Sequence, residues 1–234
     1  MNTYIYNKIY DNYYNKNIKI YGIHGPKGIG KTTLCKFLEN DFYYKHNIKV
    51  LTLSLDDFFL DYVNMIKFLI KSNDKLYSFR GLAGTHDTNL LYEVIIDLLN
   101  GKKTLIPNFD NKLFNGFGDR YNFKNINYKP DIILIEGCIL GYSYKEDINS
   151  DLYLFNEKLK EYSKIKDVIE HWFYLDTDNI KNIYIWNRNI YNNKKKNEFS
   201  YLINPYITIY RHYQLHLKNN IIIDFNRNIK NYDI

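Results

Sequence analysis

Residues 25–33, which read GPKGIGKTT, carry the clearest chemical signal in the sequence. They fit the pattern G-x-x-x-x-G-K-[ST], in which glycines allow successive backbone N–H groups to surround a polyphosphate. Lys31 adds a positive charge near the β- and γ-phosphates, and Thr32 offers a hydroxyl to Mg²⁺. The candidate nucleotide-binding residues are Gly25, Pro26, Lys27, Gly28, Ile29, Gly30, Lys31, Thr32 and Thr33. The alternative is a glycine turn that contains a lysine and binds no nucleotide.

Three acidic residues stand at the ends of short apolar runs. Asp56 and Asp57 follow one run, and Glu136 ends another that reads DIILIE. Ligands gather at the carboxyl ends of parallel strands, so Glu136 can hold Mg²⁺ through water, unless it is an ordinary acid that faces solvent. One acid of the pair can accept the proton of an attacking hydroxyl, and a nearby cation would ease their mutual repulsion. Alternatively, Asp57 caps a helix that begins near Phe58.

Strands and helices alternate along the chain, and this order must position these residues. Apolar runs predict strands at 18–23, 48–55, 131–135, 171–175 and 221–225. Helical spacing predicts helices at 32–40, 86–100, 152–163, 178–191 and 205–218. This alternation is typical of an α/β fold in which helices cover both faces of a parallel sheet. We find no repeat and no linker, so we expect a single domain over 1–234, with 1–17 as an irregular extension.

The composition excludes some classes of protein but does not identify the function. The formal charge of +6 suits a nucleic acid or an anionic small ligand, but no basic stripe interleaved with aromatics favours nucleic acid. The two cysteines, Cys35 and Cys138, form no zinc or disulfide signature. No apolar run approaches the ~20 residues of a membrane span, and no signal peptide stands out. We therefore expect a cytoplasmic protein with a small-molecule partner and neither nucleic acid nor membrane as partner.

Four stretches together resemble one family. SLDDFFL, at 54–60, resembles the S-x-D-D-F-Y-L of P-loop kinases related to plant and fungal D-glycerate 3-kinase, a group similar to uridine kinase and phosphoribulokinase. RGLAGTHD, at 80–87, resembles the family's R-G-x-P-G-T-H-D. IPNFDNKLFNGFGDR, at 106–120, resembles P-x-Y-D-K-S…G-x-G-D-R, and ILIEGCILGY, at 133–142, resembles I-L-E-G-W-x-L-G-F. The resemblance covers nearly the whole chain from Ile18 onward.

The resemblance implies a three-layer P-loop fold with a parallel sheet of about five strands, and it assigns roles in catalysis. Asp56 matches the catalytic base of the wider kinase group, and Asp57 would assist with substrate or metal. Lys31 and a lid arginine would stabilise the transferring phosphate. The family's W-R-x-Q-x-E helix is reduced to WNRN at 186–189, so its arginine is shifted to Arg188 or lost. We expect a lid at 188–205, where the lysines at 194–196 either substitute for that arginine or form a solvated loop tip.

The resemblance also implies which residues bind the substrate. They are Arg80, His86, Asp87, Asp119 and Arg120. An arginine can fork onto a carboxylate or phosphate, which suits a small acid. Two alternatives remain open: His86 and Asp87 could cap the helix that follows them, and Asp119 and Arg120 could be an internal pair that shapes a loop.

These expectations combine into one leading function. We expect an ATP-dependent small-molecule kinase that uses Mg²⁺ and transfers the γ-phosphate to a hydroxyl of a small anionic substrate, with D-glycerate as the first candidate by family. The alternatives are a kinase of another small substrate, such as a nucleoside, and a nucleotide-binding protein with weakened catalysis. The sequence leaves the oligomeric state and the adenine contacts open.

Overall fold

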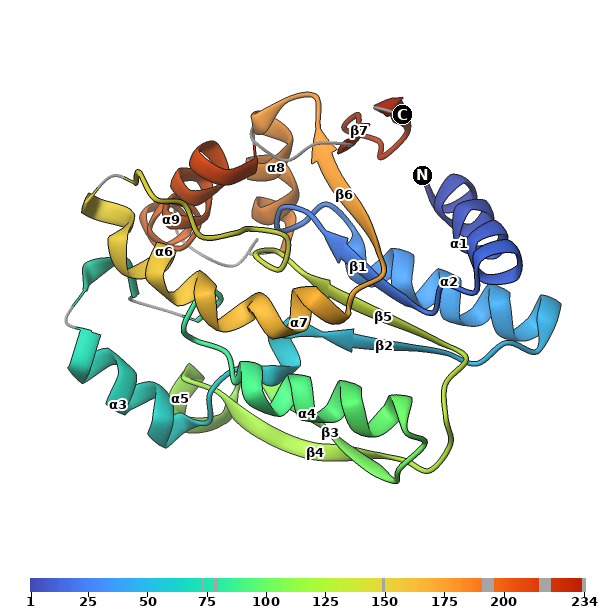
Figure 1. Ribbon diagram of the computed structural model, residues 1–234. Coiled ribbons are helices and arrows are strands. Elements are labelled where there is room, and N and C mark those ends of the chain that lie inside the picture. Colours follow the sequence, from blue (N-terminus) through green and yellow to red (C-terminus); the bar gives the residue numbers. More distant parts are fainter. Residues whose placement is uncertain (73, 78–79, 149, 191–195, 215–219, 233–234) are drawn as a thin grey trace.

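A six-stranded sheet with the strand order β2-β5-β1-β6-β7-β8 forms the centre of the computed structural model (Figure 1). The structure describes residues 1–72, 74–77, 80–148, 150–190, 196–214 and 220–232. The strands are β1 (Ile20–His24), β2 (Val50–Ser54), β5 (Ile132–Gly137), β6 (His171–Thr177), β7 (Asn220–Ile223) and β8 (Ile229–Tyr232). The first five pair in parallel and β8 adds an antiparallel edge, which confirms the predicted parallel sheet of five strands.

Helices cover both faces of this sheet, because alternate residues of its strands point to opposite sides. Ile132 and Leu134 of β5 pack in one core with α1 (Asn2–Lys16) and α2 (Lys31–His46). Ile133 and Ile135 pack in the other core. That second core includes residues from α4 (Thr88–Leu99), α6 (Tyr153–Lys158), η4 (Leu159–Tyr162) and α7 (Ser163–Val168). Every residue of β1 and β5 is buried, which explains their continuous apolar sequences.

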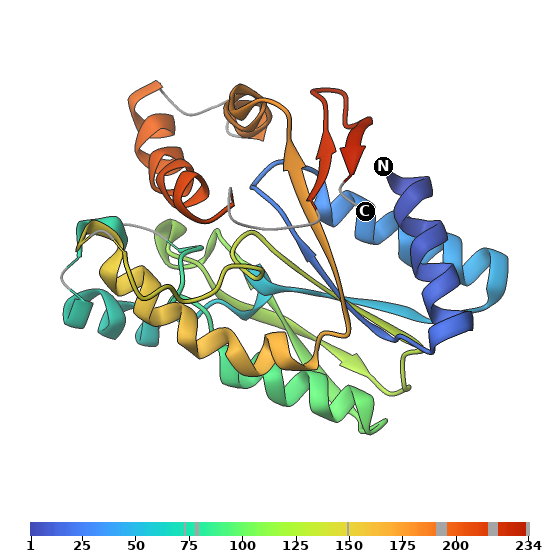
Figure 2. The ribbon, with the colours of Figure 1, turned by 45° about the horizontal axis from the view of Figure 1, so that its top comes forward.

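Two further helices lie together beyond the carboxyl ends of β1 and β6 (Figure 2). They are α8 (Ile180–Ile190) and α9 (Lys196–Tyr213), and they share a small core of Ile183, Ile203, Ile207 and Tyr210. Because this edge of the sheet also carries the glycine-rich loop, α8 and α9 form one wall of the candidate site.

A β-hairpin that the sequence did not predict forms the opposite wall. Its strands are β3 (Thr104–Asp110) and β4 (Asp119–Ile126), and α5 (Leu113–Gly116) lies at its tip. The register shifts between Ile106 and Asn108, where Pro107 lacks the N–H that a regular ladder needs. The short elements η1 (Leu55–Phe58), α3 (Tyr62–Ser72) and η2 (Lys75–Tyr77) lie between β2 and α4 in the chain.

Two predicted segments differ in the structure. The N-terminal extension is helical rather than irregular: α1 buries Ile5, Ile9 and Asn12, whose spacing of four and three residues places them on one face. The helix predicted at 152–163 is broken into η3 (Ser150–Leu152), α6, η4 and the start of α7. Among the described residues, no helix is long and apolar enough to cross a membrane.

Candidate active site

The glycine-rich loop joins the end of β1 to the start of α2, as its sequence predicts. Gly28 and Gly30 have φ values of 86° and 105°, a left-handed conformation that side chains disfavour. Lys31 is buried, and its Nζ donates to the carbonyl oxygens of Gly25 at 2.9 Å and of Pro26 at 3.4 Å. The lysine ammonium therefore lies against the backbone of the loop, while Thr32 and Thr33 are exposed at the start of α2.

Glu136 connects the ends of three elements. Its Oε1 accepts hydrogen bonds from Thr32 Oγ1 at 2.8 Å and from Ser54 Oγ at 3.1 Å. Ser54 is paired with Glu136 in the register of β2 and β5. The carboxylate is 4% exposed, so burial holds it in place beside the loop. Ser54 was not predicted, although its position directly before the acidic pair could have indicated it.

These oxygen atoms fit Mg²⁺ bound together with a nucleotide. Mg²⁺ prefers oxygen ligands and takes only one or two from the protein when substrate phosphates and water supply the rest. Within the described residues, no group of three or more His, Cys, Asp or Glu side chains could form a dedicated metal cage. Thr32 and Glu136 are thus a suitable donor set for a metal that arrives with its polyphosphate.

Asp56 and Asp57 lie in η1, directly after β2, at the same edge of the sheet. Asp56 is exposed and forms no hydrogen bond or ion pair in the part of the chain that the structure describes. Asp57 is half-buried, and its Oδ1 accepts from the backbone N–H of Phe109 at 3.2 Å. Burial raises the pKa of Asp57, the Phe109 N–H opposes this, and the negative charges of Asp56 and Glu136 add to the increase. The alternative that Asp57 caps a helix near Phe58 is wrong, because α3 begins only at Tyr62.

The charges of the loop lysine and of the first aspartate both act on the thiol of Cys138. Burial raises the pKa of its thiol; Lys31 opposes the increase and Asp56 adds to it.

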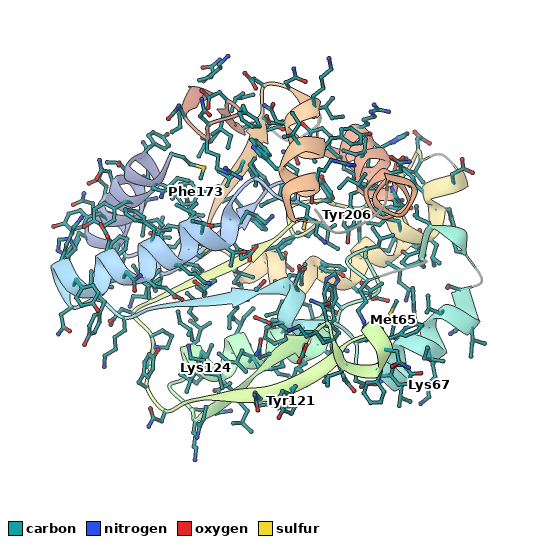
Figure 3. The ribbon with its side chains drawn as sticks, turned by 180° about the vertical axis from the view of Figure 1, so that it is seen from behind. Met65, Lys67, Tyr121, Lys124, Phe173 and Tyr206 are labelled. Atoms are coloured by element: carbon teal, nitrogen blue, oxygen red, sulfur yellow. The ribbon has the colours of Figure 1, made fainter. Side chains whose placement is uncertain are left out.

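A cavity of about 330 Å³ extends from Asp57 and Glu136 toward the hairpin. Thr32, Ser54, Asp57 and Glu136 line it, as do Pro107, Asn108 and Lys124 from β3 and β4. Figure 3 shows Lys124 on β4, in the region between the hairpin and the central sheet. The candidate site is therefore open on the side of the hairpin.

Arg80 and Arg120, predicted to hold the substrate, both donate to backbone carbonyls. Arg80 donates to the carbonyl oxygens of Leu60, of Phe117 at 2.9 Å and of Gly118 at 3.4 Å. Burial lowers the pKa of Arg80 to about 10. Arg120 Nε donates to the carbonyl of Phe59 at 2.9 Å. The two arginines therefore fasten the hairpin to the segment after η1.

The predicted acids of this region also have structural partners. Asp87 accepts from the N–H of Leu90 at 3.0 Å, which confirms the alternative that it caps α4, and it pairs with Arg120 at 2.9 Å. Asp119 accepts from the backbone N–H groups of Tyr62 at 3.3 Å and of Arg120 at 2.7 Å. Asp119 and Arg120 thus shape the end of the hairpin next to α5, where Asp119 contacts the backbone of Arg120 and the guanidinium contacts Phe59 and Asp87.

His86 is a neutral, buried imidazole. Burial, and secondarily the charge of Arg80, lowers its pKa to about 3. Its Nδ1 lies 2.7 Å from the Tyr162 hydroxyl, whose oxygen accepts from the Gly84 N–H at 3.4 Å. If the hydroxyl donates to Nδ1, Nε2 carries the ring proton. Nε2 is buried and has no hydrogen-bond partner among the described residues.

The predicted lid falls on α8, on α9 and on the residues between them. Arg188 is exposed near the end of α8, next to the buried Asn187. Residues 194 and 195, two of the three lysines considered as a substitute, lie outside the described residues. Tyr206 of α9, which the sequence did not predict, donates to the carbonyl of Arg80 at 2.8 Å, and the Lys27 ammonium lies 5.1 Å from its ring centroid.

Comparisons with known proteins agree on one family. No family model matches the chain. The chain is 32% identical over 189 residues to the "uncharacterized kinase mug58" of Schizosaccharomyces pombe, an alignment that covers 71% of this chain and 68% of that protein. It is 30% identical over 186 residues to the "probable ATP-dependent kinase TDA10" of Saccharomyces cerevisiae, with 69% and 63% covered.

Solved structures show the same fold. The YGR205w protein superposes with a TM-score of 0.86 at 24% identity and with 98% of this chain and 95% of that chain covered. The D-glycerate 3-kinase from Cryptococcus neoformans superposes with a TM-score of 0.90 at 19% identity, with 100% and 98% covered.

Proposed function

The chain belongs to the family of ATP-dependent P-loop kinases related to D-glycerate 3-kinase, and we propose that it transfers the γ-phosphate of ATP to a hydroxyl of a small anionic substrate. The observation that carries this proposal is the meeting of three strand ends. The loop after β1, the acids after β2 and Glu136 at the end of β5 share one edge of the sheet. Nucleotide, metal and acceptor can therefore approach one another there.

The proposed reaction assigns a role to each group. The loop, residues 25–33, binds the triphosphate through its N–H groups, and Lys31 adds positive charge at the β- and γ-phosphates. Asp56 accepts the proton of the acceptor hydroxyl. The hydroxyl oxygen forms a bond to the γ-phosphorus, and the bond between that phosphorus and the bridging oxygen of ADP breaks. Mg²⁺ held by Thr32 and Glu136 would neutralise phosphate charge. Asp57 would orient the acceptor side of the site through its contact with Phe109.

Arg188 and the lid at 188–205 belong to the same proposal. An arginine that reaches the transferring phosphate would stabilise the charge that develops there. The acceptor would lie toward Arg80, His86, Asp87, Asp119 and Arg120. Four of these shape the wall through the contacts above, whereas the buried His86 Nε2 has no hydrogen-bond partner among the described residues.

Replacement of Asp56 by asparagine tests the chemical step. Asp56→Asn should reduce transfer by at least about 100-fold, the usual contribution of a positioned base, while ATP binding persists. Phosphoryl transfer is measured as ADP release, and ATP binding by calorimetry. Asp147→Asn, which alters an exposed carboxylate in the segment before α6, is the matched control and should retain full activity. Full activity of Asp56→Asn would remove Asp56 from the role of base.

A panel of acceptors tests the substrate. D-glycerate and other small hydroxy acids are offered with ATP and Mg²⁺, and nucleosides are offered in parallel. We expect turnover with a hydroxy acid. Turnover with nucleosides alone would replace the proposed acceptor and leave the kinase assignment, whereas ATP binding without turnover on any acceptor would favour a binding protein.

A further inference from the structure

Three consecutive carbonyl groups of the P-loop accept hydrogen bonds from side chains that lie far away in the sequence. Asn187 Nδ2, on α8, donates to the carbonyl of Lys27 at 2.7 Å. Arg227, in the turn between β7 and β8, donates from Nη2 to the carbonyl of Gly28 at 3.0 Å and from Nε to that of Ile29 at 3.2 Å. We call Asn187 and Arg227 the brace.

The brace fixes the direction of the loop's peptide groups. The described chain has no cis peptide bonds, and in a trans peptide the C=O and the following N–H point in opposite directions. Each carbonyl held toward α8 or toward the turn between β7 and β8 therefore turns the next N–H away from them. Of these N–H groups, that of Ile29 donates to the carbonyl of Pro26 at 3.3 Å. Binding of a polyphosphate requires such oriented N–H groups, and a loop that already has this arrangement loses less entropy when the ligand binds.

Both brace side chains are themselves held in place. Asn187 is fully buried and also donates to the carbonyl of Ile183 at 2.8 Å, which orients its amide. The guanidinium carbon of Arg227 lies 5.1 Å from the Trp186 ring centroid. Trp186 in turn donates from its indole N–H to the carbonyl of Phe225 at 3.1 Å, so α8 and the C-terminal turn are joined.

The fit between the brace and the loop depends on the loop's glycines. A Cβ added to Gly28 would lie 3.0 Å from Trp186 Cβ and 3.1 Å from Asn187 Nδ2, and one added to Gly30 would lie 3.2 Å from Arg227 Nε. These glycines therefore allow the backbone to approach the brace as well as a phosphate. Asn187 stands where the W-R-x-Q-x-E motif has its arginine, so WNRN has a structural purpose in this chain.

We propose that Asn187 and Arg227 are positioning residues that orient the P-loop for its triphosphate, so that nucleotide affinity depends on α8 and on the turn after β7. This inference rests on ATP binding from the proposed function and is independent of the acceptor. It differs from a purely electrostatic contribution of Arg227, because a lysine would supply the same charge without the two directed donors.

Nucleotide affinity tests the proposal in four variants. Arg227→Lys, Arg227→Met and Asn187→Leu should each weaken MgADP binding by roughly tenfold, since hydrogen bonds of this kind contribute by about that factor. The control is Lys230→Met, which removes a positive charge from the same hairpin without touching the loop. Calorimetry at 25 °C gives the dissociation constants, and thermal unfolding without nucleotide gives stability. Loss of affinity in the three variants but not in the control supports the brace.

Two results would overturn the proposal. If Arg227→Lys binds MgADP like the wild type while Arg227→Met does not, charge alone explains the effect. If the brace variants lower the melting temperature but retain wild-type affinity in fully folded protein, the contacts are only structural.

A second measurement needs no ligand. Backbone amides of residues 28–31 should exchange with deuterium faster in Asn187→Leu and Arg227→Met than in the wild type, because the loop loses its fixed orientation. Unchanged exchange would contradict the brace. Failure of the wild-type protein to bind any adenine nucleotide would count against the proposed function, while the exchange experiment would still test the brace.

Discussion

Glu136 links the P-loop to the acids after β2, because a single carboxylate oxygen accepts from Thr32 and from Ser54. The negative charge of the same carboxylate also contributes to the raised pKa of Asp57. One buried carboxylate thus contacts the proposed metal ligand Thr32 and adds, after burial and Asp56, to the raised pKa of Asp57.

Glu136→Gln separates these two effects. The amide oxygen of glutamine can still accept both hydrogen bonds, so we expect a folded protein, but the lost negative charge should raise the Mg²⁺ concentration for half-maximal turnover by about tenfold or more. Titration of turnover with Mg²⁺ at saturating ATP provides the measurement. Glu39→Gln, which alters an acid of the same cavity that binds the N–H of Thr52, should leave the Mg²⁺ dependence unchanged. An unaltered requirement in Glu136→Gln would argue against a metal role.

Site residues were predictable where a local pattern determines their position. The loop lysine, Thr32 and Glu136 follow from a motif and from strand ends, and the structure brings the last two together. The partners of Arg80 could not be predicted, because backbone carbonyls from distant segments have no sequence signature. For the same reason the contacts of Arg227 could not be predicted, because its acceptors lie almost 200 residues earlier in the chain.

At the scale of elements, the contact between β1 and β6 depends on a glycine. Gly22 of β1 is paired with Trp172 of β6, and a Cβ on Gly22 would lie 2.5 Å from the indole ring. β1 carries the loop at its end, so the closeness of these strands determines where the loop begins.

Gly22→Ala should therefore destabilise the protein by about 1–3 kcal/mol through overpacking. Urea unfolding provides the measurement. Trp172→Leu removes the obstructing ring. In that background, Gly22→Ala should lower the free energy of unfolding by less than it does beside tryptophan. If Gly22→Ala lowers the free energy of unfolding equally with tryptophan and with leucine at position 172, the contact with Trp172 is unimportant.

Strands were predicted better than the elements around them. β1 and β5 are buried along their whole length and β2, β6 and β7 for the most part, so apolar residues dominate these strands and are visible without a structure. The β3–β4 hairpin has exposed residues and contains Pro107, and both features weaken the signal of a strand. For α1, the spacing of Ile5 and Ile9 was available, but the surrounding Tyr and Asn residues obscured it.

At the scale of the whole molecule, two buried histidines join separate parts of the fold as neutral rings. His24, at the end of β1, lies 2.8 Å from Gln214 Oε1 after α9 and accepts from the N–H of Gly141 at 3.1 Å. Burial lowers the pKa values of His24 and His86 to about 3. Both rings must therefore stay uncharged while the protein is folded.

Acid should consequently destabilise the fold from pH 6.5 downward. The unfolded chain takes up these protons near pH 6.5 whereas the folded chain does not, so the stability present above that pH is lost as the pH falls toward 3. The free energy of unfolding should decrease by up to about 1.4 kcal/mol per pH unit for each histidine. Urea unfolding from pH 7 to pH 5 measures this dependence.

The variant His86→Gln isolates the imidazole contribution. Burial raises the pKa values of Asp57 and Asp176, and these carboxyls act in the opposite direction. Since both carboxyls remain in the variant, its pH dependence should differ from the wild type only by the slope that His86 contributes. Identical slopes would contradict a neutral His86.

The central position of β1 also has a consequence for protein synthesis. Tyr21 is flanked by Leu134 and His171, so a ribosome must add more than a hundred residues after β1 before both of its neighbours exist. The nascent chain therefore carries the nucleotide-binding sequence long before any surrounding sheet can hold it. Arg227 emerges later still, so we expect ATP to bind most tightly, and to stabilise the chain most, only after the turn between β7 and β8 has been made.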